Sequence, residues 1–212
     1  MTLQKQKIYK TVLDRACRDF EASDQKGQVE RGSLIFRSSG AKQVVEVPFF
    51  DETVLLTIPD FRFESEQRRN VTLASKILIL HYLVKASGHP LSGEKVAYED
   101  LSGCRSYLPV FERRVCRPLL TAFGFNRDLF HEAGTALGGT EEEYGNSSFT
   151  LKAFPMVPIT FILWEGDQEF PPSIKVLFDR TIDGYLPLED ITVVSKLAAN
   201  RLLHAARLQT IE

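Results

Sequence analysis

The chain has 212 residues, of which 43% are hydrophobic and 25% charged, with 28 acidic against 26 basic residues. This composition is typical of a globular protein, and a chain of this length buries enough apolar surface to fold without a disulfide or a structural metal. A net charge of −2 without a basic block argues against a nucleic-acid partner. The absence of a signal-peptide core and of an apolar run near ~20 residues predicts a soluble, cytoplasmic protein with no membrane contact.

The N-terminal half is predicted to contain two helices that flank a strand meander. Four apolar residues at helical spacing predict a helix over about residues 4–22, before a polar loop at 23–27. The four residues are Ile8, Val12, Ala16 and Phe20. Alternating apolar residues and short turns predict three antiparallel strands. These strands are expected at 34–37, 44–50 and 54–58. The apolar segment 72–87 predicts a core helix that Thr72 or Asn70 caps.

The C-terminal half alternates between helical and strand-like patterns. Helices are expected at 109–123, 126–137, 173–178 and 187–208, and strands at 149–154 and 157–164. Asn126 can cap the second of these helices. Pro118 predicts a kink or an early end in the first of these helices, because proline lacks a backbone N–H. Pro171 and Pro172 suit the start of a helix at 173–178. The acidic segment 140–143 is expected to be a solvated loop.

These elements predict a single α+β domain over residues 1–212, with a mostly antiparallel sheet packed against several helices. The N-terminal helix, within residues 1–25, is expected to pack on this domain.

The cysteines argue against a cofactor bound through thiolates of this chain. Cys17, Cys104 and Cys116 are odd in number and include no Cys-x-x-Cys pair. A disulfide framework and a thiolate zinc or iron–sulfur site both need more cysteines or a closer spacing. Reduced, buried thiols are the expected state.

An acidic segment follows the predicted strand 157–164 and is the most unusual passage in the sequence. Glu165, Asp167 and Glu169 occupy alternate positions, so they would share one face if the strand continued. Clustered carboxylates can hold Mg²⁺ or Ca²⁺, or can divide acid and base roles between them, with Asp179 as a fourth member. Alternatively, the same residues form a turn and cap the next helix. A ligand site at this acidic segment requires that the segment faces a cavity.

Three further residues are candidates for ligand or partner binding. His89 precedes Pro90 in a glycine-flanked loop, where side chains can contact a ligand. Tyr107 and Arg113 combine residue types that recognise anions or protein partners, although ordinary surface charge explains them as well. No paired-histidine metal motif, phosphate loop or serine-nucleophile elbow occurs, so outside the acidic segment no catalytic or metal-binding residue is predicted.

Several stretches together resemble a known family. They are Ile79–Leu83, Ser87–Glu94, Trp164–Pro172, Val176–Asp179 and Tyr185–Ile191. They are similar to the uncharacterised domain of unknown function three-seven-eight-six, found mainly in anaerobic bacteria and archaea, over residues 30–208. The resemblance supplies no catalytic residues. It implies an association with cysteine-rich four-iron–four-sulfur domains or with corrinoid and one-carbon enzymes, and here any such cofactor would belong to a partner.

Two functions compete on this basis. The first is a non-catalytic binding or accessory module for a protein or cofactor-bearing partner in anaerobic metabolism, such as corrinoid or one-carbon metabolism. The alternative is a metal-dependent or acid–base enzyme that uses Glu165, Asp167 and Glu169.

Overall fold

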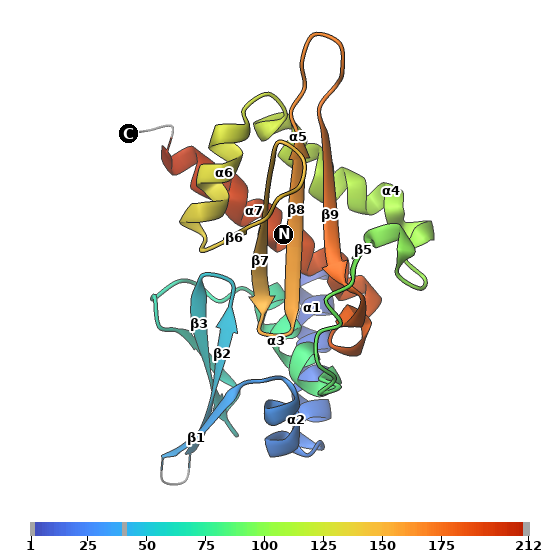
Figure 1. The fold of residues 1–212 in the computed structure, drawn as a ribbon. Coiled ribbons are helices and arrows are strands. Elements are labelled where there is room, and N and C mark those ends of the chain that lie inside the picture. The colour runs from blue at the N-terminus through green and yellow to red at the C-terminus, as the bar shows by residue number, and fades with distance from the viewer. Residues whose placement is uncertain (1–2, 40–41, 210–212) are drawn as a thin grey trace. The chain divides into compact units, whose positions relative to one another are not determined.

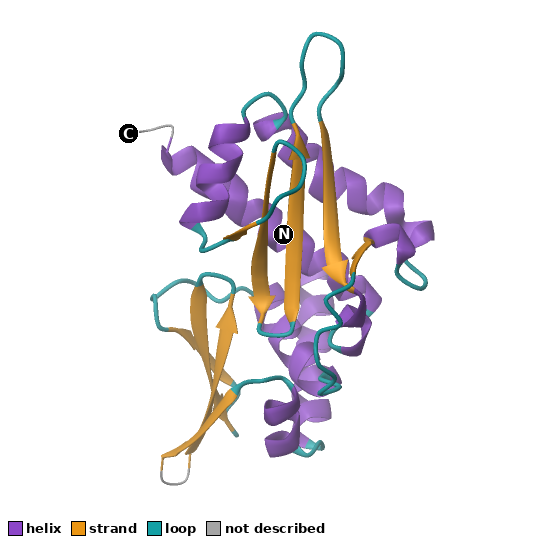
Figure 2. Cartoon of the chain, in the orientation of Figure 1, coloured by secondary structure: helices purple, strands orange, loops and turns teal. Residues whose placement is uncertain are grey.

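The computed structural model describes residues 3–39 and 42–209 and has two antiparallel sheets together with helices, so the predicted α+β class is confirmed (Figures 1 and 2). The chain divides into two compact units. Unit 1 consists of Met1–Pro90, Phe154–Met156 and Thr181–Asp190; unit 2 consists of Leu91–Ala153, Val157–Arg180 and Ile191–Glu212. The expectation of one continuous domain stays a prediction. No helix among the described residues is long and apolar enough to cross a membrane.

The sheet of unit 1 is a four-stranded antiparallel meander. Its strands are β1 (Ile35–Ser39), β2 (Lys42–Phe49), β3 (Glu52–Ile58) and β4 (Arg62–Ser65), in that spatial order. The three predicted strands are therefore confirmed. Val45 pairs with Leu56 across β2 and β3, and both side chains are buried, because alternate residues share the inner face. The short strand β4 was not predicted, because its own four residues carry one apolar side chain, Phe63.

Three helices belong to unit 1: α1 (Leu3–Glu21), α2 (Gln25–Arg31) and α3 (Leu73–Lys85). Helix α1 packs against α3 and buries Ala16 and Phe20, whereas Ile8 is 57% exposed. Thr72 accepts a hydrogen bond from Ser75 N and caps α3, as predicted. Helix α2 occupies most of the segment predicted as a loop at 23–27 and continues beyond it. Its sequence is polar, and the side chain of Asp24 caps it by accepting a hydrogen bond from Gly27 N.

Tyr82 on α3 is the centre of the core of unit 1. Its buried ring stacks on Phe154 with 4.3 Å between centroids, and its hydroxyl donates to Gly32 O at 2.6 Å. The same oxygen accepts a hydrogen bond from Met156 N at 3.3 Å. Burial raises the pKa of this hydroxyl, so it stays a neutral donor. One side chain thus connects three segments of unit 1 that are distant in sequence.

The sheet of unit 2 has five strands in the order β5-β9-β8-β7-β6. These are β5 (Lys95–Ala97), β9 (Ser173–Asp179), β8 (Val157–Trp164), β7 (Ser147–Phe154) and β6 (Thr140–Glu141). The predicted helix at 173–178 is wrong, because this segment is β9. Val176 and Phe178 are buried, whereas Lys175 is exposed, which is the period of two of a strand. The two prolines before it lead into a strand, and the predicted loop at 140–143 contains the short edge strand β6.

In Figure 2 the helices of unit 2 lie behind this sheet and on either side of it. They are α4 (Leu108–Phe111), α5 (Arg117–Phe123), α6 (Arg127–Ala136) and most of α7 (Leu188–Gln209). A π-helical turn, Glu112–Cys116, joins α4 to α5 just before Pro118. The predicted interruption is therefore confirmed, since the proline ring excludes the regular helical hydrogen bond. Asn126 caps α6 as predicted, with its side chain accepting from Leu129 N at 2.9 Å.

Gly134 allows α6 to lie close to the sheet of unit 2. A Cβ atom at this position would lie 2.4 Å from Cδ1 of Phe149, whose ring packs against Phe130 with 4.7 Å between centroids. We expect Gly134→Ala to lower the free energy of unfolding by about 1–3 kcal/mol, because overpacking outweighs the higher helix propensity of alanine. Urea unfolding measures this change. The control is Thr135→Ala at the exposed neighbouring position, and equal stability of the two variants would contradict the packing argument.

Candidate functional site

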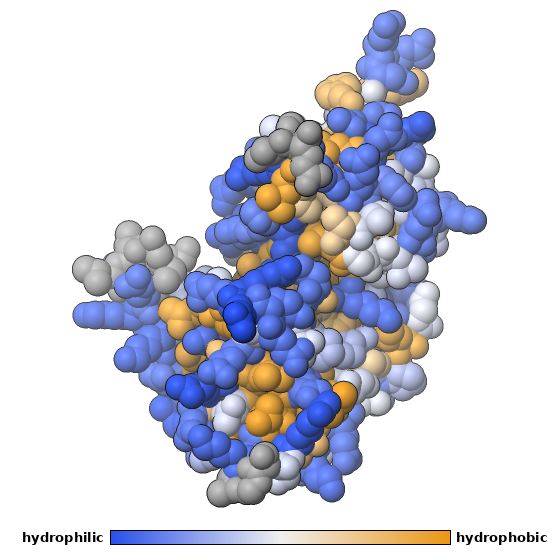
Figure 3. Space-filling model, turned by 90° about the vertical axis from the view of Figure 1, so that its left-hand side faces the viewer, coloured by the Kyte–Doolittle hydropathy of each residue, from blue (hydrophilic) through white to orange (hydrophobic). Residues whose placement is uncertain are grey.

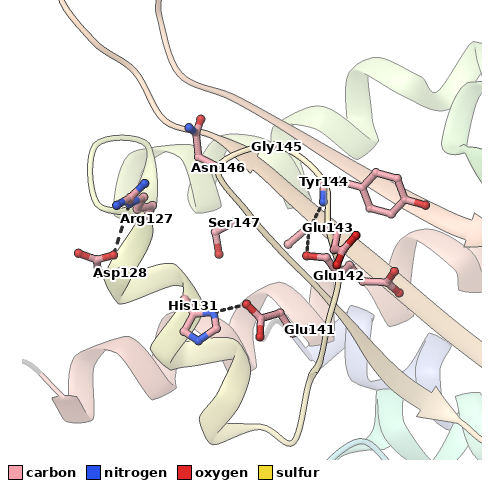
Figure 4. Close-up of a pocket in the computed structure, with 11 residues that line it drawn as sticks. Arg127, Asp128, His131, Glu141, Glu142, Glu143, Tyr144, Gly145, Asn146 and Ser147 are labelled. Carbon is pink, nitrogen blue, oxygen red and sulfur yellow. Dashed lines mark hydrogen bonds and ion pairs between the residues drawn. The ribbon is translucent and has the colours of Figure 1, made fainter.

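A polar pocket lies between α6 and the segment that connects β6 to β7 in unit 2 (Figure 4). Its volume is about 250 Å³, and it is open to solvent. We call it the α6–β7 pocket. It is lined by Arg127, Asp128, His131 and the continuous segment from Glu141 to Ser148.

Glu165 fixes one rim of this pocket. Its Oε1 atom accepts a hydrogen bond from Arg127 N at 3.0 Å, at the first turn of α6. A carboxylate in this position complements the positive end of the helix dipole. Glu165 N donates to Asn146 Oδ1 at 2.9 Å, so the same residue holds the opposite side of the rim. Glu165 therefore connects the backbone of Arg127 to the side chain of Asn146.

The charge of the pocket is negative. Four acidic residues line it, Asp128, Glu141, Glu142 and Glu143, against one arginine. Glu142 is already paired within the protein. Lys95 Nζ lies 2.6 Å from its Oε1 atom, and the Thr150 hydroxyl donates to the same atom at 2.6 Å.

Glu142 and Glu141 each lie close to a basic side chain. Burial acts to raise the pKa of Glu142, but the hydrogen bonds from Lys95 and Thr150 hold it below its usual value. His131 Nδ1 lies 4.0 Å from Glu141 Oε1. Asp128, Glu141 and Glu143 are exposed, and Asp128 Oδ1 lies 3.5 Å from Arg127 Nε, so a positively charged group from outside competes with this internal ion pair.

Ser147 adds a hydroxyl group with unmet hydrogen-bonding capacity. Among the described residues, its buried Oγ atom has no hydrogen-bond partner. Figure 4 shows this hydroxyl directed toward the space between α6 and the acidic segment that contains Glu141. Buried polar atoms are normally paired, so this wall of the pocket suits a polar group of a bound molecule.

The predicted acidic segment does not continue the strand. β8 ends at Trp164, and the following residues form a loop. Asp167 Oδ1 accepts hydrogen bonds from Phe170 N at 2.7 Å and from Glu169 N at 2.8 Å. These two bonds lower the pKa of Asp167. Asp167 and Glu169 are exposed, and of the three candidate carboxylates Glu165 alone is hydrogen-bonded to residues that line the pocket.

Asp179 lies elsewhere in unit 2 and holds a turn. It is 6% exposed, and its carboxylate accepts three hydrogen bonds from the segment before β5. Ser92 N and Ser92 Oγ donate to Oδ1 at 3.1 and 2.9 Å, and Gly93 N donates to Oδ2 at 2.8 Å. Gly93 has a φ of 74°, a conformation that glycine adopts without strain.

The other three candidates do not line the pocket. His89 is exposed in unit 1, and its carbonyl oxygen accepts a hydrogen bond from the Tyr185 hydroxyl. Tyr107 and Arg113 are exposed side chains in unit 2, before and within the π-helical turn. Within residues 3–39 and 42–209, no group of three or more His, Cys, Asp or Glu residues is placed to hold a metal ion.

Sequence reasoning missed most of the pocket. The helix at 126–137 was predicted without a site on it, and the acidic segment after Gly139 was expected to be a solvated loop. Each element was recognised by itself through the cap at Asn126 and the run of glutamates. Nothing in the local pattern indicated that β6 and β7 bring the glutamates beside α6.

The fold and the site define an α+β protein with an open, negatively charged pocket. The chain matches the model of the family described as domain of unknown function (DUF3786) over residues 29–201, and it belongs to this family. The α6–β7 pocket lies within the matched region, whereas α1 precedes it. No curated protein and no solved structure matches the chain.

Proposed function

We propose that the chain is a non-catalytic binding or accessory module whose α6–β7 pocket receives a lysine or arginine side chain of a partner protein. The observation that carries this proposal is the excess of carboxylates around an open cavity. Asp128, Glu141 and Glu143 surround a space of about 250 Å³, which is sufficient for one long basic side chain. Opposite charges at such a surface contribute mainly to specificity and to the rate of association.

An aromatic ring of the same segment already contacts a cation of this chain, and Figure 4 shows the ring directed away from the space beside α6. Tyr144 lines the pocket, and Lys95 Nζ lies 5.0 Å from the centroid of its ring. This geometry is that of a cation–π contact, which is favourable for ammonium and guanidinium groups. The Ser147 hydroxyl and the carboxylates supply the polar groups that a guanidinium or ammonium needs around it.

The partner that we propose is a cofactor-bearing protein of anaerobic metabolism, such as an iron–sulfur or corrinoid protein. This part of the proposal is supported by the family resemblance and by the cysteine pattern, which leaves a thiolate-bound cofactor to another chain. We do not propose the metal-dependent or acid–base enzyme, because Glu165 and Asp167 accept hydrogen bonds from backbone amides at two different places.

Titration of the ¹⁵N-labelled protein with N-acetyl-arginine methylamide tests the pocket. We expect saturable shifts of the amide resonances of Asp128, His131 and Ser147 in NMR spectra. The double variant Glu141→Gln/Glu143→Gln should weaken binding by about tenfold, because loss of the carboxylates removes the favourable charge while it preserves side-chain size. Binding should also weaken as salt is added, since the charges are exposed.

The matched control is Glu30→Gln/Glu64→Gln, at two exposed acids of unit 1. It should leave binding unchanged, and N-acetyl-glutamate methylamide should cause no shifts. Shifts of equal size at acids over the whole surface, or no shifts at the pocket, would contradict the proposal.

A further inference from the structure

The loop between β8 and β9, residues 165–172, presents large apolar side chains to solvent. It extends beyond the ends of the two strands in Figure 1. Phe170 in this loop is 68% exposed, Phe125 at its base is 70% exposed, and Trp164 is 39% exposed. In Figure 3 the end of the protrusion is hydrophilic, with hydrophobic atoms directly beneath it. Clustered exposed aromatic residues are characteristic of protein-binding surfaces.

This loop is held in one conformation by its own hydrogen bonds. Asp167 N donates to Phe170 O at 2.9 Å, while Asp167 Oδ1 accepts from Phe170 N at 2.7 Å. At the base, Gly166 N donates to Gly124 O at 2.8 Å. A Cβ atom at Gly166 would lie 2.5 Å from Cε1 of Phe125, so this ring packs directly on the loop backbone. The loop therefore presents Phe170 without a large entropic cost on binding.

The same unit contains an apolar groove between α5, α6 and α7. Its volume is about 440 Å³. The lining is formed by Pro118, Ala122, Leu129, Leu203 and Ala206, with Arg207 as the one charged residue and Thr121 beside it. No residue of the β8–β9 loop lines this groove. The loop and the groove of one molecule are thus separate surfaces.

We infer that the chain associates with a second copy of itself, in which Phe170 of one molecule occupies the α5–α6–α7 groove of the other. The two surfaces are complementary in chemistry. The groove is apolar with a cation at Arg207, whereas Phe170 is preceded by exposed carboxylates at Asp167 and Glu169. Reciprocal exchange of the two loops closes the assembly as a two-fold dimer, which is the commonest symmetry of protein oligomers.

Sedimentation equilibrium of the full chain at increasing concentration tests this inference. We expect a monomer–dimer equilibrium. Phe170→Ser removes the ring, and Ala122→Glu places a bulky anion at an exposed position of the groove. Each variant should raise the dimer dissociation constant by at least tenfold. Ile8→Ser, at an exposed apolar residue of α1 outside both surfaces and outside the α6–β7 pocket, is the control and should leave it unchanged.

Mixing the variants separates this arrangement from other dimers. Phe170→Ser mixed with Ala122→Glu retains one intact loop–groove pair and should form a heterodimer. The double variant mixed with the wild-type chain retains none and should not. A wild-type chain that is monomeric at every concentration, including one that binds only a different protein through Phe170, would overturn the inference. So would variants that dimerise as well as the wild type. Binding of the arginine probe at the α6–β7 pocket is measured separately and does not depend on this result.

Discussion

Tyr82→Ala is expected to lower the free energy of unfolding of unit 1 by about 4 kcal/mol, within the range for large buried aromatic side chains. The substitution removes the ring that stacks on Phe154 and leaves a cavity in the core. It also removes the hydroxyl that Gly32 O and Met156 N both contact. Hydrogen exchange followed by mass spectrometry measures the effect, because peptides from α3 and β2 report on unit 1 separately.

Tyr82→Phe separates the contribution of the ring from that of the hydroxyl group. The phenyl ring keeps the stacking on Phe154, but the buried carbonyl of Gly32 loses its donor. We expect a loss of about 1–3 kcal/mol, the usual consequence of an unpaired buried polar group. A phenylalanine variant as unstable as the alanine variant would show that packing contributes little, which would contradict the role assigned to the stacked rings.

Asp179→Ala is expected to destabilise unit 2 by about 3 kcal/mol, because it removes a buried, charged hydrogen-bond acceptor. Ser92 N, Ser92 Oγ and Gly93 N would lose their shared partner at once. The amide protons of Ser92 and Gly93 should therefore exchange much faster with solvent. Urea unfolding and hydrogen exchange measure the two effects.

Glu94→Gln is the matched control, because Glu94 is an exposed acid on the same segment. Its carboxylate is hydrogen-bonded by Arg180, and we expect little change in stability because solvent screens an exposed ion pair of this kind. An Asp179→Ala variant that is more stable than the wild type would support a ligand-binding role for Asp179 instead. Residues held in place for function are often unfavourable for stability.

The sequence predicted those parts of the fold that depend on local patterns. The β2–β3 pair, the caps at Thr72 and Asn126 and the long final helix each have a signal within a few residues. β9 was mistaken for a helix because two prolines begin either element equally well. Its identity depends on pairing with β8, and that contact crosses the eight-residue loop 165–172. A short apolar segment does not reveal its partner.

The candidate site was predicted less well, for a related reason. Alternation past the end of β8 suggested that three carboxylates converge, but that alternation applies only while the strand continues, and β8 ends at Trp164. Glu165 is connected to the α6–β7 pocket through Arg127 and Asn146, which are 38 and 19 residues away in sequence. Contacts over such separations follow from the assembled sheet and not from spacing along the chain.

The wider turn before Pro118 determines which way a whole row of side chains points. Phe111, Val115, Leu119 and Phe123 recur every four residues, and all four are buried. In a regular α-helix, residues four apart rotate by about 40° at each step, so such a row would wind progressively away from the sheet. The extra residue in the π-helical turn reduces this winding and keeps Phe111 stacked on Tyr98 with 4.0 Å between centroids. Deleting one residue of this turn would therefore rotate Phe111 away from Tyr98 and toward solvent.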